Sequence, residues 1–188
     1  MIREIIKKKN KAVFIDRDGT LIRDRNYLAD PDRIDFYKNS FKTIRLLKKA
    51  GYSVIITTNQ SGIERGLLSL KQLKKIHAVL RRVLIQHNAL IDGIYFCPHT
   101  TGRKCSCRKP KIGMAKQAQR ERTLDLARSF SIGDKISDVY FAWNFGGKGI
   151  LVLTGKGRRA YRKLTKKEPN HISPTLYDAA RWIIKYDN

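Results

Sequence analysis

An apolar run that ends in two aspartates is the feature of this sequence that most constrains its fold. Residues 12–15 are apolar, and Asp16-Arg17-Asp18-Gly19-Thr20 follows directly. Such a run is typical of a buried strand, and glycine suits the turn that ends it. Because alternate residues of an extended chain point the same way, the two carboxylates would face one side at the edge of a sheet. They are suited to hold a hard divalent cation, or to act as nucleophile and general acid.

On its own, this pattern also fits a strand followed by an ordinary Asp-Gly turn, so the rest of the chain decides. Helix-like periodicity covers residues 39–50, 69–87, 111–122, about 139–145 and 174–186, and strand-like runs cover residues 52–57, 91–96, 127–132 and 149–153. This alternation predicts a three-layer, Rossmann-like α/β fold, with helices on both faces of a parallel sheet. In such sheets the functional site lies beyond the carboxyl ends of the strands, where each polar motif of this chain falls.

The length and charge of the chain limit its class. Its 188 residues fit a single domain, with a basic lead-in (1–11) and a basic segment plus closing helix (155–188). The net charge is +24, from 40 Lys and Arg against 16 Asp and Glu, which favours an anionic substrate or partner, or a solvated surface that simply uses lysine. No apolar run approaches the ~20 residues that span a membrane, and residues 1–9 contain no apolar segment long enough for a signal peptide. We therefore expect a cytoplasmic protein.

The polar residues after the predicted strands suit hydrolysis of a phosphate monoester. The transferring group is negatively charged, so a metal ion and positioned donors must neutralise it. Between them, Asp16 and Asp18 can supply a nucleophile and a proton donor for the leaving alcohol. Thr58, which follows the second strand, would donate its hydroxyl to a phosphate oxygen, and Lys109 would add a fixed positive charge.

A third acid completes a predicted metal site. Asp134 follows the fourth strand, and with Asp16 and the carbonyl of Asp18 it would form an oxygen-rich Mg²⁺ site. Asp138 has two interpretations, since it would either orient Lys135 or the metal's waters, or cap a helix. The two histidines at 77 and 87 of the second predicted helix have no metal-type partner nearby, so they are interpreted as ordinary surface or boundary residues.

Four potential zinc ligands lie within eleven residues: Cys97, His99, Cys105 and Cys107. Three thiols and an imidazole suit tetrahedral Zn²⁺ and leave no open position, which indicates a structural metal in the loop over residues 97–107. The alternative is three free thiols beside an unrelated histidine. The loop runs directly into Arg108 and Lys109, so zinc would hold both side chains over the site. Arg108 can bind a second anionic group bidentately.

These motifs resemble those of a known superfamily. The segment Asp16-Arg17-Asp18-Gly19-Thr20 looks like the D-x-D-G-T motif of haloacid-dehalogenase-like phosphatases, and the Thr58, Lys109 and Asp134 motifs follow in that superfamily's order. Between about residues 11 and 154, the sequence is similar to one subgroup, the D-glycero-D-manno-heptose 1,7-bisphosphate 7-phosphatases, which are related to histidinol-phosphate phosphatases. The segments that carry this similarity include Thr58-Asn59-Gln60-Ser61-Gly62-Ile63, Cys97-Pro98-His99, Cys105-Ser106-Cys107-Arg108-Lys109-Pro110 and Gly133-Asp134-Lys135.

The resemblance implies a compact enzyme without a large cap domain. It would remove the 7-phosphate of a heptose bisphosphate through an aspartyl-phosphate, with catalytic Mg²⁺ and structural Zn²⁺. Its product would feed nucleotide-activated heptose synthesis for lipopolysaccharide core. The substrate contacts that the resemblance implies are Asp24, Arg25, Asn26, Tyr27, Asn59, Gln60, Ser61, Arg108 and Lys135.

Three other functions stay open on the sequence. A histidinol-phosphate phosphatase shares the acid motif and the zinc loop. A polynucleotide 3′-phosphatase would suit the charge, but that group is not expected to have a zinc loop, and the basic tail lacks clear aromatic stacking platforms, so nucleic acid is disfavoured as a partner. A binding protein on a retired phosphatase fold conflicts with the intact acids. We expect a monomer, because no long apolar face is left unaccounted for.

Overall fold

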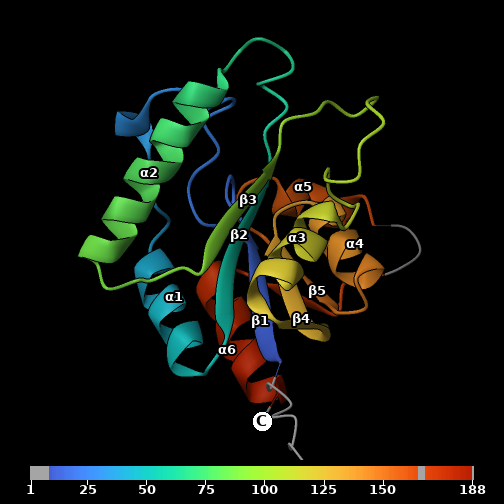
Figure 1. Ribbon diagram of the computed structural model, residues 1–188. Coiled ribbons are helices and arrows are strands. Elements are labelled where there is room, and N and C mark those ends of the chain that lie inside the picture. The colour runs from blue at the N-terminus through green and yellow to red at the C-terminus, as the bar shows by residue number, and fades with distance from the viewer. Residues whose placement is uncertain (1–8, 165–167, 188) are drawn as a thin grey trace, which may run out of the picture.

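The computed structural model describes residues 9–164 and 168–187 of the chain. Within them, six strands form one parallel sheet in the order β3-β2-β1-β4-β5-β6 (Figure 1). The strands are β1 (Asn10–Asp16), β2 (Ser53–Asn59), β3 (Gly93–Cys97), β4 (Leu124–Gly133), β5 (Lys148–Val152) and β6 (His171–Ser173). The strand that carries the two aspartates therefore lies inside the sheet, between β2 and β4.

Helices cover both faces of the sheet, which confirms the predicted three-layer fold. One face packs against α1 (Ser40–Lys49), α2 (Leu70–Gln86) and α6 (Leu176–Asp187), and the other against α3 (Gly113–Arg122) and α4 (Ile136–Asn144), as Figure 1 shows. A short 3₁₀ turn, η1 (Pro31–Arg33), and a short helix, α5 (Gly157–Arg162), complete the elements.

Strand β1 is apolar without interruption because both of its faces are buried. Val13 and Ile15 belong to the core cluster shared with α1, α2 and α6, whereas Ala12 and Phe14 belong to the cluster under α3 and α4. The ring of Phe14 meets the ring of Phe141 edge-on at 5.7 Å between centroids. This two-sided burial is typical of an interior parallel strand, and it explains why residues 12–15 are all apolar.

Two helix boundaries follow local sequence signals. Ser69 caps α2 as predicted, since its hydroxyl accepts a hydrogen bond from the backbone of Gln72 while the Gln72 side chain accepts one from the backbone of Ser69. Gly51, just past the end of α1, adopts a φ of 84°, a conformation that favours glycine.

Several boundaries differ from the sequence prediction. Strand β6 and helix α5 were not predicted, and β4 begins at Leu124 rather than at residue 127. Of the predicted lead-in, residues 1–8 lie outside the described residues, while Asn10 and Lys11 already belong to β1, because they pair with the start of β4.

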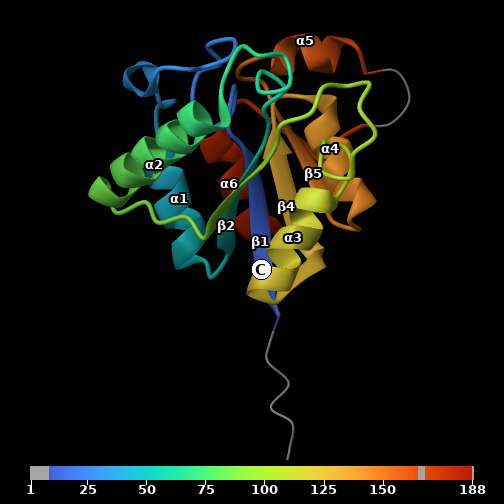
Figure 2. The same cartoon turned by 45° about the horizontal axis from the view of Figure 1, so that its top comes forward.

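The loops that follow the strands gather at one end of the sheet. Figure 2 shows the connections after β1, β2 and β3 at the same end as α5. In the described part of the chain, these connections are loops and short helices, with no large cap domain.

No helix within residues 9–164 and 168–187 is both long enough and apolar enough to cross a membrane.

Candidate active site

Asp16 is the buried acid at the end of β1, and two lysines contact its carboxylate. Its side chain is 4% exposed, Lys109 Nζ donates to its Oδ1 at 2.7 Å, and Lys135 Nζ lies 3.3 Å from its Oδ2. Burial alone would raise the pKa of Asp16, but the adjacent ammonium groups hold that pKa below its ordinary value. The carboxylate is therefore held in its ionised form, the form in which it could attack phosphorus.

Lys109 is locked in place from several sides. Besides Asp16, its buried ammonium contacts the Thr57 carbonyl at 2.8 Å and Asp138 Oδ1 at 2.6 Å. Burial opposes its charge, but the carboxylates of Asp138 and Asp16 raise the pKa of Lys109. The side chain of Asn59 also brackets the Lys109 peptide, accepting from its N–H at 3.0 Å and donating to its carbonyl at 3.2 Å. The site thus holds a fixed positive charge beside the Asp16 carboxylate.

The Asp18 carboxylate lies at the cavity wall and is held by three side chains. Arg17 contacts it through Nε at 3.0 Å and Nη2 at 2.9 Å, Gln60 Nε2 donates to it at 2.8 Å, and Thr58 Oγ1 donates to it at 3.3 Å. Gln60 also bonds to Thr58 Oγ1 at 2.7 Å. Asp18 is partly accessible, whereas Arg17, Thr58 and Gln60 are buried, so this network fixes the second acid of the motif.

Three oxygen atoms, one of them from Asp16, lie close enough together that they could hold a hard cation. Lys135 Nζ lies among them, 3.3 Å from Asp16 Oδ2, 3.3 Å from the Asp18 carbonyl and 3.0 Å from Asp134 Oδ1. These are the three ligands predicted for Mg²⁺, and the ammonium of Lys135 already contacts all of them. Burial, reinforced by the charge of Asp16, raises the pKa of Asp134 to about 6. The carboxylates and the carbonyl are hard oxygen ligands of the kind that Mg²⁺ prefers, so the residues present fit the ion.

Asp138 performs one of its two predicted roles and adds another. Its Oδ2 accepts a hydrogen bond from the Lys135 backbone N–H at 3.1 Å, which caps the start of α4. Its Oδ1 pairs with the ammonium of Lys109. Asp138, Asp16 and Asp134 form a buried cluster of three acids whose oxygen atoms lie within 4.8 Å of one another.

A cavity of about 450 Å³ opens above these groups. Most of the predicted catalytic and substrate-contacting residues line it: Asp16, Asp18, Asp24, Asn26, Tyr27, Thr58, Asn59, Gln60, Ser61, Arg108, Lys109 and Lys135. Arg25 is the exception among them, because its guanidinium reaches away to Asp35 at 2.8 Å and does not line the cavity. The expectation that Arg25 contacts the substrate therefore has no support from its position.

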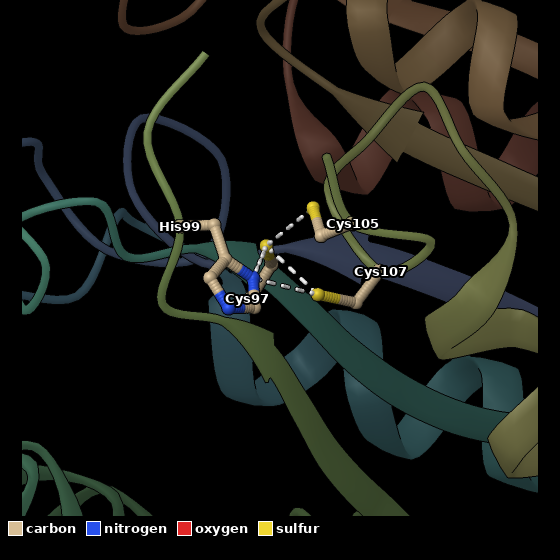
Figure 3. Close-up of side chains that lie close together, drawn as sticks. All are labelled: Cys97, His99, Cys105 and Cys107. Carbon is tan, nitrogen blue, oxygen red and sulfur yellow. Dashed lines mark hydrogen bonds between the residues drawn. The ribbon is translucent and has the colours of Figure 1, made fainter. Parts of the chain in front are cut away.

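The cysteine cluster is assembled where β3 ends, as Figure 3 shows. The sulfur of Cys97 lies 3.5 Å from His99 Nδ1, 3.9 Å from the sulfur of Cys105 and 3.0 Å from the sulfur of Cys107, which is 3.3 Å from His99 Nδ1. Sulfur and nitrogen ligands around tetrahedral zinc lie about 3.5–3.8 Å apart, given zinc–ligand bonds of about 2.0–2.3 Å. The four side chains could therefore hold a metal ion of this kind.

The same loop positions Arg108. Its Nη1 donates to the carbonyl of His99 at 2.8 Å, and its Nη2 lies 3.4 Å from Thr101 Oγ1. Both partners belong to the loop that carries the cysteine cluster. Arg108 lines the cavity, and its guanidinium is hydrogen-bonded to this loop. The conformation of the loop therefore determines the position of the Arg108 charge in the cavity.

Sequence reasoning missed three residues of this region. Arg17 lies inside the recognised motif but was given no role, and His77, which contacts it, was interpreted as an ordinary residue. Lys156 follows β5, lines the cavity, pairs with Asp24 at 3.1 Å and donates its backbone N–H to Asp134 Oδ2 at 2.7 Å. The rule that functional groups follow the carboxyl ends of strands would have found Lys156.

Comparisons with known proteins agree with this geometry. A HAD-hydrolase-like family model matches residues 106–179. The D-glycero-beta-D-manno-heptose-1,7-bisphosphate 7-phosphatase of Helicobacter pylori (strain J99) is 41% identical over 146 residues, which are 77% of this chain and 84% of the relative. The enzyme of the same name from Pasteurella multocida is 37% identical over 185 residues, covering 92% of this chain and 96% of the relative.

A solved structure shares the whole architecture. It is the D,D-heptose 1,7-bisphosphate phosphatase from B. bronchiseptica complexed with magnesium and phosphate, with a TM-score of 0.85 and 32% identity, covering 94% of this chain and 99% of that one. The chain is thus a phosphatase of the HAD-like superfamily, and it belongs to the family of D-glycero-beta-D-manno-heptose-1,7-bisphosphate 7-phosphatases.

Proposed function

We propose that this chain removes the 7-phosphate of D-glycero-D-manno-heptose 1,7-bisphosphate with the help of Mg²⁺. The names of its relatives support this substrate, and the solved relative holds magnesium and phosphate. The observation that carries the proposal is a single cavity that presents Asp16, Asp18 and Lys109 together with Arg108. The first three suit the reacting phosphate, and the guanidinium of Arg108 suits a second phosphate on the same small molecule.

The reaction proceeds in two displacements at phosphorus. The Asp16 carboxylate attacks the 7-phosphate, the bond from phosphorus to the sugar oxygen breaks, and Asp18 in its acid form gives that oxygen its proton. Water then attacks the aspartyl-phosphate and gives a proton to Asp18. The bond from phosphorus to Asp16 breaks, inorganic phosphate leaves, and both side chains return to their starting forms.

Charge neutralisation comes from the fixed groups around the phosphate. Asp16, Asp134 and the Asp18 carbonyl would hold Mg²⁺, which would supply positive charge against the phosphate oxygens. Lys109 adds a second positive charge that costs no reorganisation, because its carboxylate and carbonyl partners already orient it. The ammonium of Lys135 lies among these three oxygen atoms and lines the cavity, so an ion held there would have to take its place.

We also propose that the cysteine cluster holds structural zinc. All four ligands come from the protein, so no position is left for a substrate. The loop carries few buried apolar residues of its own, and a bound metal would compensate for that. Through the His99 carbonyl, this loop sets the position of Arg108. That the enzyme is a cytoplasmic monomer and feeds lipopolysaccharide core synthesis stays a prediction.

Phosphate release from three compounds tests the assignment. Heptose 1,7-bisphosphate, histidinol phosphate and a 3′-phosphorylated oligonucleotide are compared with Mg²⁺ present and with Asp16→Asn as the blank. We expect a clear preference for the bisphosphate that disappears in the variant. A preference for either of the other compounds would overturn the substrate assignment while leaving the phosphatase chemistry intact.

A matched pair of arginine variants tests the second phosphate site. Arg108→Met should raise the KM for the bisphosphate by about 10–100-fold, since a charge-assisted hydrogen bond is lost. Arg103→Met, on the same loop, should leave KM unchanged, because Arg103 is 67% exposed and pairs with Glu64 away from the cavity. Equal effects from both variants would show that Arg108 acts only through the loop fold.

A further inference from the structure

Arg17 is a buried guanidinium in the middle of the catalytic motif. It is 1% exposed, and its Nε and Nη2 contact the Asp18 carboxylate. Its third nitrogen, Nη1, lies 3.2 Å from Nε2 of His77 on α2. A buried guanidinium needs a hydrogen-bond acceptor for each of its N–H edges. His77 is that acceptor for Nη1.

His77 has the protonation state that this contact requires. Burial lowers the pKa of His77 to about 3, and the nearby charges of Arg17 and Arg81 act in the same direction, so the ring is neutral at physiological pH. Because a guanidinium only donates hydrogen bonds, Nε2 of the neutral ring is the acceptor and Nδ1 carries the proton. The ring of Phe96 lies edge-on to His77 at 5.8 Å between centroids and limits its rotation.

We propose that His77 is a positioning residue for catalysis, which acts by holding Arg17 in the orientation that keeps the Asp18 carboxylate at the cavity wall. The inference rests on the proposed role of Asp18 as proton donor. His77 is not among the residues that line the cavity, so its effect on the site would pass through its contact with Arg17. Helix α2, on one face of the sheet, is thereby connected to the proton-transfer group at the end of β1.

If His77 positions Arg17, loss of its acceptor nitrogen should affect catalysis, whereas loss of a packing contact alone should affect only stability. Without an acceptor at Nη1, the guanidinium is free to turn toward other acceptors and to carry Asp18 with it. A displacement of about 1 Å in a catalytic group costs up to about 100-fold in rate. The loss should fall on the step that needs a proton donor, namely departure of an alkoxide-like oxygen, and much less on departure of a stable phenolate.

The test compares two substitutions at position 77 with two substrates. His77→Leu keeps the apolar contacts but removes the acceptor, whereas His77→Gln keeps an amide oxygen that can accept from Arg17. His87→Leu, at the end of the same helix, is the matched control. Turnover is measured on an alkyl phosphate that the enzyme accepts and on p-nitrophenyl phosphate, and thermal unfolding verifies that each variant is folded.

We expect His77→Leu to lower kcat on the alkyl phosphate by about 10–100-fold with little change in KM, and to lower kcat on p-nitrophenyl phosphate by less than about 3-fold. His77→Gln should recover most of the loss, and His87→Leu should show none. Equal losses on both substrates, or no rescue by glutamine, would reduce His77 to a packing residue and overturn the inference.

A double variant separates this inference from the proposed function. If His77 acts through Asp18, adding His77→Leu to Asp18→Asn should cost almost nothing further, since interacting residues are not additive. A full additional loss would refute the connection. If Asp18→Asn itself leaves turnover of the alkyl phosphate intact, the assigned role of Asp18 fails instead.

Discussion

The ammonium of Lys135 lies 3.0 Å from Asp134 Oδ1, in the position among three oxygen atoms where a metal ion would bind. Metal binding must therefore displace this ammonium. We expect Lys135→Met to bind Mg²⁺ at least about 10-fold more tightly in the absence of substrate, because the competing charge is gone, while turnover falls. Isothermal titration of the free enzyme with Mg²⁺ measures this.

The control for this titration is Lys156→Met. The ammonium of Lys156 is also near the site, but it pairs with Asp24 at 3.1 Å rather than with the oxygen set. Its removal should change the Mg²⁺ affinity far less. Equal affinities for wild type and Lys135→Met would show that Lys135 does not compete with the ion.

The cysteine cluster predicts a specific loss of stability. Cys107→Ser should lower the melting temperature by about 5 °C or more, because binding of a structural metal contributes to folding. It should also raise KM for the bisphosphate, since Arg108 is anchored on the same loop. Elemental analysis should find one zinc per wild-type chain and none in the variant.

Ser106→Ala is the matched control for the cysteine variant. Ser106 lies between two of the cysteines, is exposed and offers no ligand. It should keep both the zinc and the melting temperature of the wild type. A metal-free wild-type protein with an unchanged melting temperature would contradict the structural role of zinc.

Gly19 is required by both its backbone and its surroundings. Its φ is 92°, and a Cβ there would lie 2.1 Å from Asp134 Oδ2. Gly19→Ala should therefore displace Asp134, weaken Mg²⁺ binding and lower turnover by more than about 100-fold. Gly102→Ala is the control, because a Cβ at Gly102 meets nothing within 4 Å. Normal Mg²⁺ affinity in Gly19→Ala would disprove the steric argument.

The neutral state of His77 predicts a pH-dependent stability. Its pKa is about 3 in the folded chain, against about 6.5 when unfolded. The unfolded chain therefore binds more protons between these values, so stability falls as the pH drops below about 6.5, by up to roughly 1.4 kcal/mol per pH unit. His77→Gln lacks this contribution.

Urea unfolding of wild type and His77→Gln at pH 7.5, 6.5 and 5.5 checks this sign. The difference in unfolding free energy between the two proteins should shift in favour of the variant as the pH falls. A difference that stays constant over this range would mean that His77 titrates normally in the folded chain.

Most of the layer structure could be predicted from the sequence, because the strongest signals were long and periodic. The run over residues 12–15 is buried on both faces, and α2 begins at the predicted cap, Ser69. By contrast, β6 (His171–Ser173) is three residues long, shorter than any alternation that a sequence pattern can establish. Helix α5 lacks an apolar stripe, since its sequence Gly-Arg-Arg-Ala-Tyr-Arg is largely basic.

Site residues that directly follow a strand could be predicted from the sequence. Contacts of long side chains, which have several possible partners, could not. The cavity gathers Asp18, Thr58 and Lys109, as the topology required. Arg25 turns to Asp35 instead, and His77 reaches the motif from a helix whose register on the sheet no local pattern fixes. Such contacts depend on tertiary packing, which a sequence pattern does not contain.

The most direct test of the central claim is phosphorus NMR of heptose 1,7-bisphosphate during turnover with Mg²⁺. The account predicts that the 7-phosphate signal is replaced by inorganic phosphate while the 1-phosphate signal persists, and that Asp16→Asn leaves both signals unchanged. Release of the 1-phosphate first, or turnover that survives in Asp16→Asn, would contradict it.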